Sequence, residues 1–112
     1  MSLVMSGLDC HRAGVRLRET LAFSKDGVKE MLVWLKQQPG VTGCVLLSTC
    51  NRTEIYLSGD FESAPWRPLC RGARADESAL EPYFTTRMGE DAAKHLMEVA
   101  CGLHSQILGE DQ

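Results

Sequence analysis

The pattern of hydrophobic positions divides the first sixty residues into a strand, a helix and a pair of strands. Residues 2–8 alternate weakly between apolar and polar side chains, which is typical of a strand. Residues 21–38 carry apolar side chains at the spacing of one helical face, and Pro39-Gly40 ends that helix. Two short apolar segments follow, residues 44–47 and 54–58, and we expect them to form a hairpin with residues 48–53 as its exposed turn.

The second half of the chain predicts two more helices and a fourth strand. A helix is expected within residues 60–69, where two prolines oppose it, and residues 83–88 alternate as a strand. Residues 90–103 form a last helix, which we expect to be well buried because it is apolar on two sides. Those sides are Ala93, Leu96, Met97 and Ala100 on one, and Ala92 and Val99 on the other.

The order strand, helix, strand, strand, helix, strand predicts an α+β fold of the ferredoxin-like, split βαβ kind. In this fold a four-stranded antiparallel sheet carries helices on one face. Residues 1–88 would form this sandwich, and residues 89–112 would begin a C-terminal helical segment. A length of 112 residues fits one domain.

Composition narrows the class of protein. The chain is 44% hydrophobic and 24% charged, as in globular proteins, and it has neither a signal peptide nor an apolar run of the roughly 18 residues that cross a membrane. Its five cysteines are scattered without metal-ligand spacing, which indicates reduced thiols, a cytoplasmic location and no metal. A net charge of −3 excludes a generally basic surface for nucleic acid. Arg67, Arg71 and Arg74, close to Trp66, are a local exception that fits either a contact with a nucleic-acid backbone or a solvated loop.

Cys50 is the candidate nucleophile. A thiol must become a thiolate to attack a carbonyl carbon, and Arg52 nearby supplies a positive charge that favours the anion. Thr49, Asn51 and the amides of a tight turn could donate hydrogen bonds to the sulfur or to a developing oxyanion. Composition alone favours a free cysteine that serves as a small buried hydrophobe, and the polar neighbours on both sides argue against that interpretation.

Three segments of the chain resemble glutamyl-tRNA reductase, in the order found in that family. The first is residues 7–11 with 15–19, and the third is His95-Leu96 with residues 102–112. The second contains the candidate nucleophile and reads Ser48-Thr49-Cys50-Asn51-Arg52-Thr53-Glu54-Ile55-Tyr56. The chain is therefore similar to the N-terminal catalytic domain of glutamyl-tRNA reductases over essentially its whole length.

The resemblance implies a mechanism. Cys50 would attack the ester of glutamyl-tRNA to give a glutamyl thioester, which NADPH then reduces to glutamate-1-semialdehyde for tetrapyrrole synthesis. Arg52 would recognise the substrate carboxylate, and His95 would handle protons. If His95 and Ser105 serve the same site, the chain must bend near Gly102, because ten residues of straight helix span about 15 Å. The substrate-contacting residues implied by the resemblance are Thr49, Cys50, Asn51, Arg52, Ser105, Glu110, Asp111 and Gln112.

The chain also departs from the family. None of its ten glycines forms a GxGxxG motif, so we expect no NADPH site here and place the NADPH-binding and dimerisation domains of the homodimeric full-length enzyme outside this sequence. The chain would then be either a piece of a longer enzyme, which we prefer, or a stand-alone homologue of the catalytic domain, and we expect it to retain only esterase activity. Cys10, His11 and Gly14 differ from the usual opening segment. Two alternatives remain: a non-catalytic regulatory or partner-binding module of the same fold, and a cysteine hydrolase or redox-sensing thiol in which Cys44 approaches Cys50.

Overall fold

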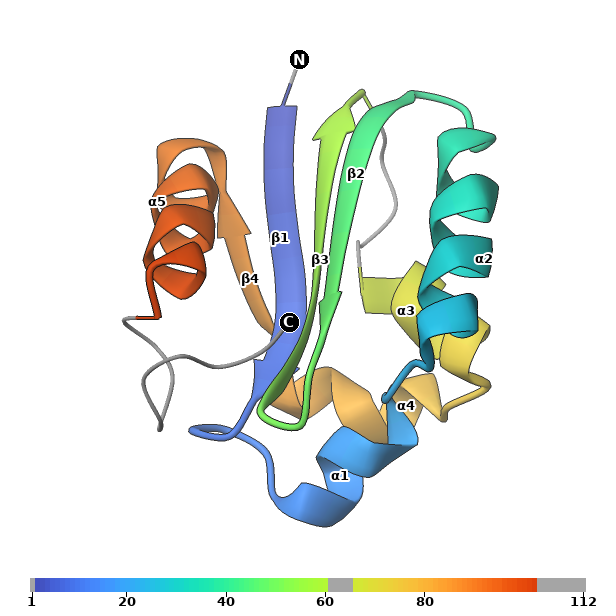
Figure 1. The fold of residues 1–112 in the computed structure, drawn as a ribbon, viewed down its shortest axis with the longest axis vertical. Coiled ribbons are helices and arrows are strands. Elements are labelled where there is room, and N and C mark those ends of the chain that lie inside the picture. The colour runs from blue at the N-terminus through green and yellow to red at the C-terminus, as the bar shows by residue number, and fades with distance from the viewer. Residues whose placement is uncertain (1, 61–65, 103–112) are drawn as a thin grey trace.

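The computed structural model describes residues 2–60 and 66–102, and Figure 1 shows their arrangement around one sheet. Its strands are β1 (Ser2–Asp9), β2 (Val41–Ser48), β3 (Arg52–Gly59) and β4 (Thr85–Met88). Its helices are α1 (Val15–Thr20), α2 (Lys25–Lys36), α3 (Trp66–Ala73), α4 (Glu77–Leu80), the single 3-10 turn η1 (Glu81–Tyr83) and α5 (Gly89–Ala100). No helix in these described ranges is long and apolar enough to span a membrane.

The four strands form one antiparallel sheet in the order β2-β3-β1-β4, which confirms the predicted mixed α/β class and sheet. Strand β1 pairs with β3 along its full length and with β4 over four residues. The two central strands, β1 and β3, are therefore covered on both edges, and β3 is buried at seven of its eight positions. A residue on β3 is thus placed in the interior whichever face it points to.

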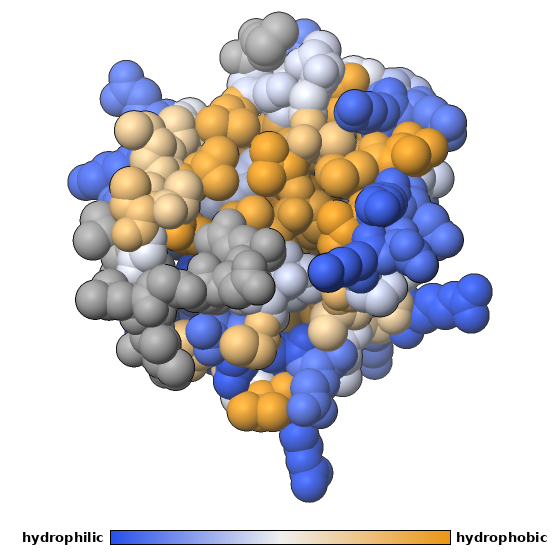
Figure 2. Space-filling view, in the orientation of Figure 1, coloured by the Kyte–Doolittle hydropathy of each residue, from blue (hydrophilic) through white to orange (hydrophobic). Residues whose placement is uncertain are grey.

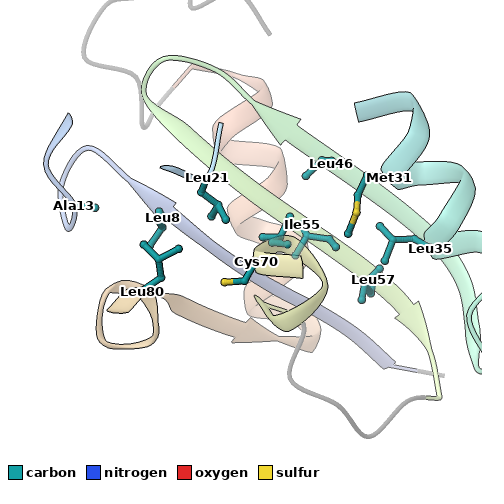
Figure 3. Packing of buried hydrophobic residues seen from close by; sticks show 11 residues of the cluster. Leu8, Ala13, Leu21, Met31, Leu35, Leu46, Ile55, Leu57, Cys70 and Leu80 are labelled. Carbon is teal, nitrogen blue, oxygen red and sulfur yellow. The ribbon is translucent and has the colours of Figure 1, made fainter. Parts of the chain in front are cut away.

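One face of the sheet carries the main hydrophobic core. Leu8 from β1, Leu46 from β2 and Ile55 from β3 pack there against side chains of α2, α3 and α4 (Figure 3). Leu21 and Leu69 are completely buried in the same cluster. Alternation along β3 directs Ile55 and Leu57 to this face, so Arg52, Glu54 and Tyr56 must point to the other.

Helix α5 covers that other face. It contacts β1 and β4 (Figure 1), and Ala92 packs with Met5 and Tyr56 in a second, smaller cluster. The prediction that α5 is buried on two sides is wrong. Its buried residues are Ala92, His95 and Val99, whereas Met97 is 69% exposed, because a helix lying on a sheet can bury only one stripe.

The structure changes several predicted boundaries. The helix expected over residues 21–38 is shorter, Lys25–Lys36, because the Ser24 hydroxyl accepts a hydrogen bond from the Gly27 amide and starts α2 there. Helix α1, which precedes that range, was not predicted. The hairpin turn is shorter than residues 48–53, since β3 already begins at Arg52, which is buried. Arg67 and Arg71 lie on helix α3 rather than in a loop.

Candidate functional site

The turn between β2 and β3 exposes Cys50. Its flanking residue Thr49 donates its backbone N–H to the Arg52 carbonyl at 2.8 Å, and the Thr49 hydroxyl accepts from the amides of Asn51 and Arg52 at 3.2 and 3.3 Å. This is the local bonding that favours threonine in tight turns. Three of the turn's amides are therefore used within it, which argues against the expectation that turn amides serve the sulfur.

Arg18 of α1 fixes the Cys50 backbone. Its guanidinium donates to the Cys50 carbonyl at 2.7 Å and to the Ala13 carbonyl at 3.1 Å. The side chain of Arg18 thus connects the loop after β1 with the thiol turn, and Arg18 itself is 32 residues from Cys50 in the sequence. From the sequence, Arg52 was expected to be the positive charge beside the thiol, and Arg18 was not identified.

A cluster of polar side chains is buried between β3 and α5. The Glu54 carboxylate is its centre: Tyr56 Oη donates to Oε1 at 2.9 Å, His95 Nε2 lies 2.8 Å from Oε2, and Arg52 Nη1 lies 3.5 Å from Oε2. Arg52 and Glu54 are each 1% exposed and His95 is 5% exposed. Burial and the neighbouring carboxylate, in that order, raise the pKa of Tyr56, so this residue is a neutral donor.

The cluster fixes the orientation of His95. An ionised carboxylate is only an acceptor, so the nitrogen facing Glu54, Nε2, must carry a proton. The Arg52 charge offsets that of Glu54 in a region with little water, where an unpaired carboxylate would be strongly unfavourable. Arg52, Glu54 and His95 thus form one electrostatic unit.

Gly7 makes room for this unit. It lies opposite Glu54 in the β1–β3 pairing, and a Cβ at position 7 would stand 2.5 Å from the Thr53 carbonyl oxygen and 2.7 Å from Glu54 Cγ. Both distances are below those that real Cβ atoms show, so a larger residue would displace the Glu54 side chain. This explains physically why the first similar segment contains a glycine on a central strand.

Cys44 and Cys70 pack in the main core rather than pairing with Cys50. All five thiols are free. Cys44 lies on β2 and packs against the main core, and since strands rise about 3.3 Å per residue, roughly 13 Å of strand separates it from Ser48 at the start of the turn. Burial raises the pKa of Cys44, and burial followed by Glu77 and Asp76 raises the pKa of Cys70 to about 11. The proposed approach of Cys44 to Cys50 is therefore wrong.

The predicted site residues fall into three groups. Thr49, Cys50 and Asn51 form the turn, while Arg52 and His95 meet at Glu54 beneath the adjoining strand. Ser105, Glu110, Asp111 and Gln112 lie outside the described residues.

Glu54, Tyr56 and Arg18 were missed as members of the site. The alternation of residues 52, 54 and 56 could have indicated one polar face of β3, but the sequence did not reveal that a helix covers that face.

The helix break expected near Gly102 is confirmed. Helix α5 ends at Ala100, the Gly102 amide donates to the Val99 carbonyl at 3.0 Å, and Gly102 adopts a φ of +79°. Glycine is favoured at this helix-ending position because it has no Cβ.

Within the described ranges, no group of three or more His, Cys, Asp or Glu is arranged to hold a metal ion.

Fold and site together define a small α/β domain with an exposed thiol on a hairpin turn and a buried carboxylate–histidine–arginine cluster beside it. Residues 6–112 match the family model for the glutamyl-tRNAGlu reductase N-terminal domain, and the chain therefore belongs to that family.

Named relatives support this assignment. The glutamyl-tRNA reductase of Moorella thermoacetica is 44% identical over 119 residues, which cover 100% of this chain and 26% of the relative. The probable multifunctional siroheme biosynthesis protein HemA of Ruminiclostridium josui is 41% identical, with 100% of this chain and 22% of the relative covered. A solved structure of glutamyl-tRNA reductase from Methanopyrus kandleri aligns with a TM-score of 0.64 and 32% identity, over 96% of this chain and 24% of that one. The chain thus spans about a quarter of the length of these proteins.

Proposed function

We propose that this domain catalyses the first half of the glutamyl-tRNA reductase reaction in tetrapyrrole biosynthesis, the transfer of the glutamyl group from tRNA to Cys50. The observation that carries the proposal is the exposed thiol of Cys50, held on a turn that leads directly into the buried Arg52–Glu54–His95 cluster. The strand order β2-β3-β1-β4 supports classing the domain as ferredoxin-like. The reduced thiols and the relatives fit a cytoplasmic enzyme.

In the proposed step, the Cys50 thiolate attacks the ester carbonyl carbon that joins glutamate to the terminal ribose. A carbon–sulfur bond forms, the carbon–oxygen bond to the ribose breaks, and the ribose oxygen takes up the proton that the thiol released. Arg18 holds the Cys50 carbonyl, so the turn does not have to be ordered when the substrate binds.

His95 is the proposed proton carrier, and Glu54 is its positioning residue. With Nε2 bonded to Glu54, the imidazole can deliver a proton from Nδ1 to the departing ribose oxygen. Glu54 also stabilises the imidazolium when the histidine is charged, because the two groups are 2.8 Å apart.

Arg52 is proposed to recognise the side-chain carboxylate of the glutamyl group through its planar guanidinium. Its side chain is fully buried in this structure, so substrate entry must uncover it. Thr49, Asn51, Ser105, Glu110, Asp111 and Gln112 are proposed to complete the substrate site.

Reduction of the thioester lies beyond this chain. The aldehyde product requires a hydride from NADPH, yet the sequence has no glycine-rich strand-to-helix loop that could hold the pyrophosphate of that cofactor. We therefore assign reduction and dimerisation to the full-length enzyme, and propose that this domain alone hydrolyses the thioester slowly.

The test is to mix the purified chain with glutamyl-tRNA labelled in the amino acid and to look for a covalent adduct that free thiols release. We expect an adduct with the unaltered chain and none with Cys50→Ala. Cys101→Ala is the matched control, because Cys101 is also an exposed free thiol and its loss should leave the adduct unchanged. An adduct that persists in Cys50→Ala, or one that never forms, would refute the proposal and favour a non-catalytic module.

A further inference from the structure

A groove on the helical side of the sheet is not used by the chemistry above. It lies where α2 contacts α3, and it consists of two adjoining cavities of about 250 and 260 Å³. Trp34, Pro68 and Arg71 belong to the walls of both, so the cavities share a boundary. Each is smaller than the roughly 300–1,000 Å³ of most drug-sized ligand sites, which suits a single planar ring rather than a whole dinucleotide.

The walls of the groove combine an aromatic plane with positive charge. Trp34 is half-buried on α2, and Arg71 is exposed on α3 across from it. Arg74, also exposed, is the first residue after α3 and lies outside the residues that line the two cavities. Glu30 is in the wall of the first cavity, on α2, so a phosphate is favoured on the α3 side. Flat aromatic side chains next to arginines are the usual surface for unpaired nucleic-acid strands, because bases stack on the rings and phosphates bind the guanidinium groups.

Two backbone features support a binding role. Arg74 has a φ of +56°, and Ala75 N–H donates to the Cys70 carbonyl at 2.8 Å around it. Glycine is favoured at such a helix end, so an arginine there is unfavourable for the backbone. At Gly72, a Cβ would lie 2.7 Å from Met31 Sδ and 3.3 Å from the Phe23 ring, both in the wall of the first cavity. A side chain there would fill the cavity.

The groove is connected to the thiol turn. Phe23, which lines the first cavity, donates its backbone N–H at 3.1 Å to the hydroxyl of Ser48, the last residue of β2. One hydrogen bond thus joins Phe23, in the wall of the groove, to Ser48, which precedes the Cys50 turn. A nucleic-acid strand whose end lies at Cys50 would therefore leave the turn next to this groove.

We propose that the α2–α3 groove binds the unpaired 3′ strand of the substrate tRNA, with one base stacked on Trp34 and with Arg71 and Arg74 on its phosphates. This inference rests on the proposed function, because only a tRNA ester would bring such a strand to Cys50. It assigns to this domain a nucleic-acid contact separate from the recognition of the glutamyl group.

The test measures binding of the 112-residue chain to a short RNA hairpin that ends in an unpaired 3′ tail, and to the same hairpin without the tail. Trp34→Leu should weaken binding of the tailed hairpin by about 5-fold to 150-fold, the range for loss of one base stack, and should not change binding of the blunt one. Trp34→Phe, which keeps an aromatic ring, should retain most of the affinity.

Arginine variants test the phosphate contacts separately from folding. Arg71→Ala and Arg74→Gly should each reduce the slope of log affinity against log salt by about 0.7. Arg74→Gly should weaken RNA binding while unfolding at the same or a higher temperature, since glycine suits that backbone conformation. The matched control is Lys94→Ala, which removes an exposed charge from α5 on the other face of the sheet and should bind as the unaltered chain does.

The inference is overturned if the tail adds no affinity to the unaltered chain, or if the Trp34 and arginine variants bind the tailed hairpin as Lys94→Ala does. Its failure differs from failure of the proposed function. The hairpin carries no glutamate, so its binding does not depend on Cys50, whereas adduct formation does. Trp34→Leu should still form the adduct, but at a higher half-saturating concentration of glutamyl-tRNA.

Discussion

Replacement of Glu54 by glutamine should destabilise the domain strongly, although it changes the shape of the side chain very little. The change removes the negative charge that faces Arg52 at 3.5 Å and His95 at 2.8 Å, and it leaves the Arg52 guanidinium buried without that charge. Breaking a buried ion pair by removal of one partner costs about 3–5 kcal/mol. A domain of this size has a free energy of unfolding of about 5–15 kcal/mol, so roughly a fifth or more should be lost.

The assay is equilibrium unfolding in urea, followed by circular dichroism, with thermal unfolding in parallel. We expect the melting temperature of Glu54→Gln to fall by more than about 10 °C. Asp91→Asn is the matched control, because it removes one carboxylate from the exposed pair with Arg87, whose side chains are 33% and 60% exposed. Exposed pairs contribute about 0–1 kcal/mol, so this control should stay close to the unaltered chain.

A double variant tests whether charge, rather than packing, causes the loss. Arg52→Met with Glu54→Leu removes both charges and keeps apolar volume, and buried ion pairs replaced in this way often lose little stability. The double variant should therefore be more stable than Glu54→Gln alone. If the free energy of unfolding of Glu54→Gln is within about 1 kcal/mol of that of the unaltered chain, Glu54 is not an ionised partner of Arg52 and His95 in the folded state.

Three further changes have expected outcomes. Gly7→Ala should displace Glu54 and lower the free energy of unfolding by about 1–3 kcal/mol in urea melts, and an unchanged midpoint would contradict the close approach. Arg18→Ala should cost about 1 kcal/mol and speed hydrogen exchange in the Cys50 turn, and equal exchange rates would show that the arginine does not hold it. Between pH 9 and 11 the folded chain keeps a proton on Cys70 that the unfolded chain releases, since burial raises the pKa of this thiol from 9.0 to about 11. The free energy of unfolding should therefore fall as pH rises through this window, by about 2–3 kcal/mol at most. When thermal unfolding is followed against pH, the stability of Cys70→Ala should fall less over the same window.

The burial of Arg52 could be found only in the tertiary structure. Its guanidinium was expected on an exposed turn, ready for a carboxylate, yet β3 begins at this residue and its side chain is buried beside Glu54. The sequence alone allowed a surface ion pair with Glu54. The sequence did not reveal that the pair is buried. Burial increases the free energy that is lost when one partner of an ion pair is removed.

The sequence by itself determined the four strands, the approximate extents of helices α2 and α5, and the position of the thiol. Alternation and short apolar runs marked the strands, one apolar face marked α2, and a short polar run placed Cys50 on a hairpin turn. These features depend on neighbours within a few residues, so they can be read along the chain.

Only the tertiary structure decided which faces are covered and which distant side chains meet. Alternation shows that the two faces of β3 differ, but a polar face can be solvated or can be buried with its charges paired, and the pattern is the same in both cases. Here α5 covers that face and brings His95 to Glu54 across 41 residues, as Arg18 reaches Cys50 across 32. Such contacts depend on how the sheet and helices pack together, which no local pattern specifies.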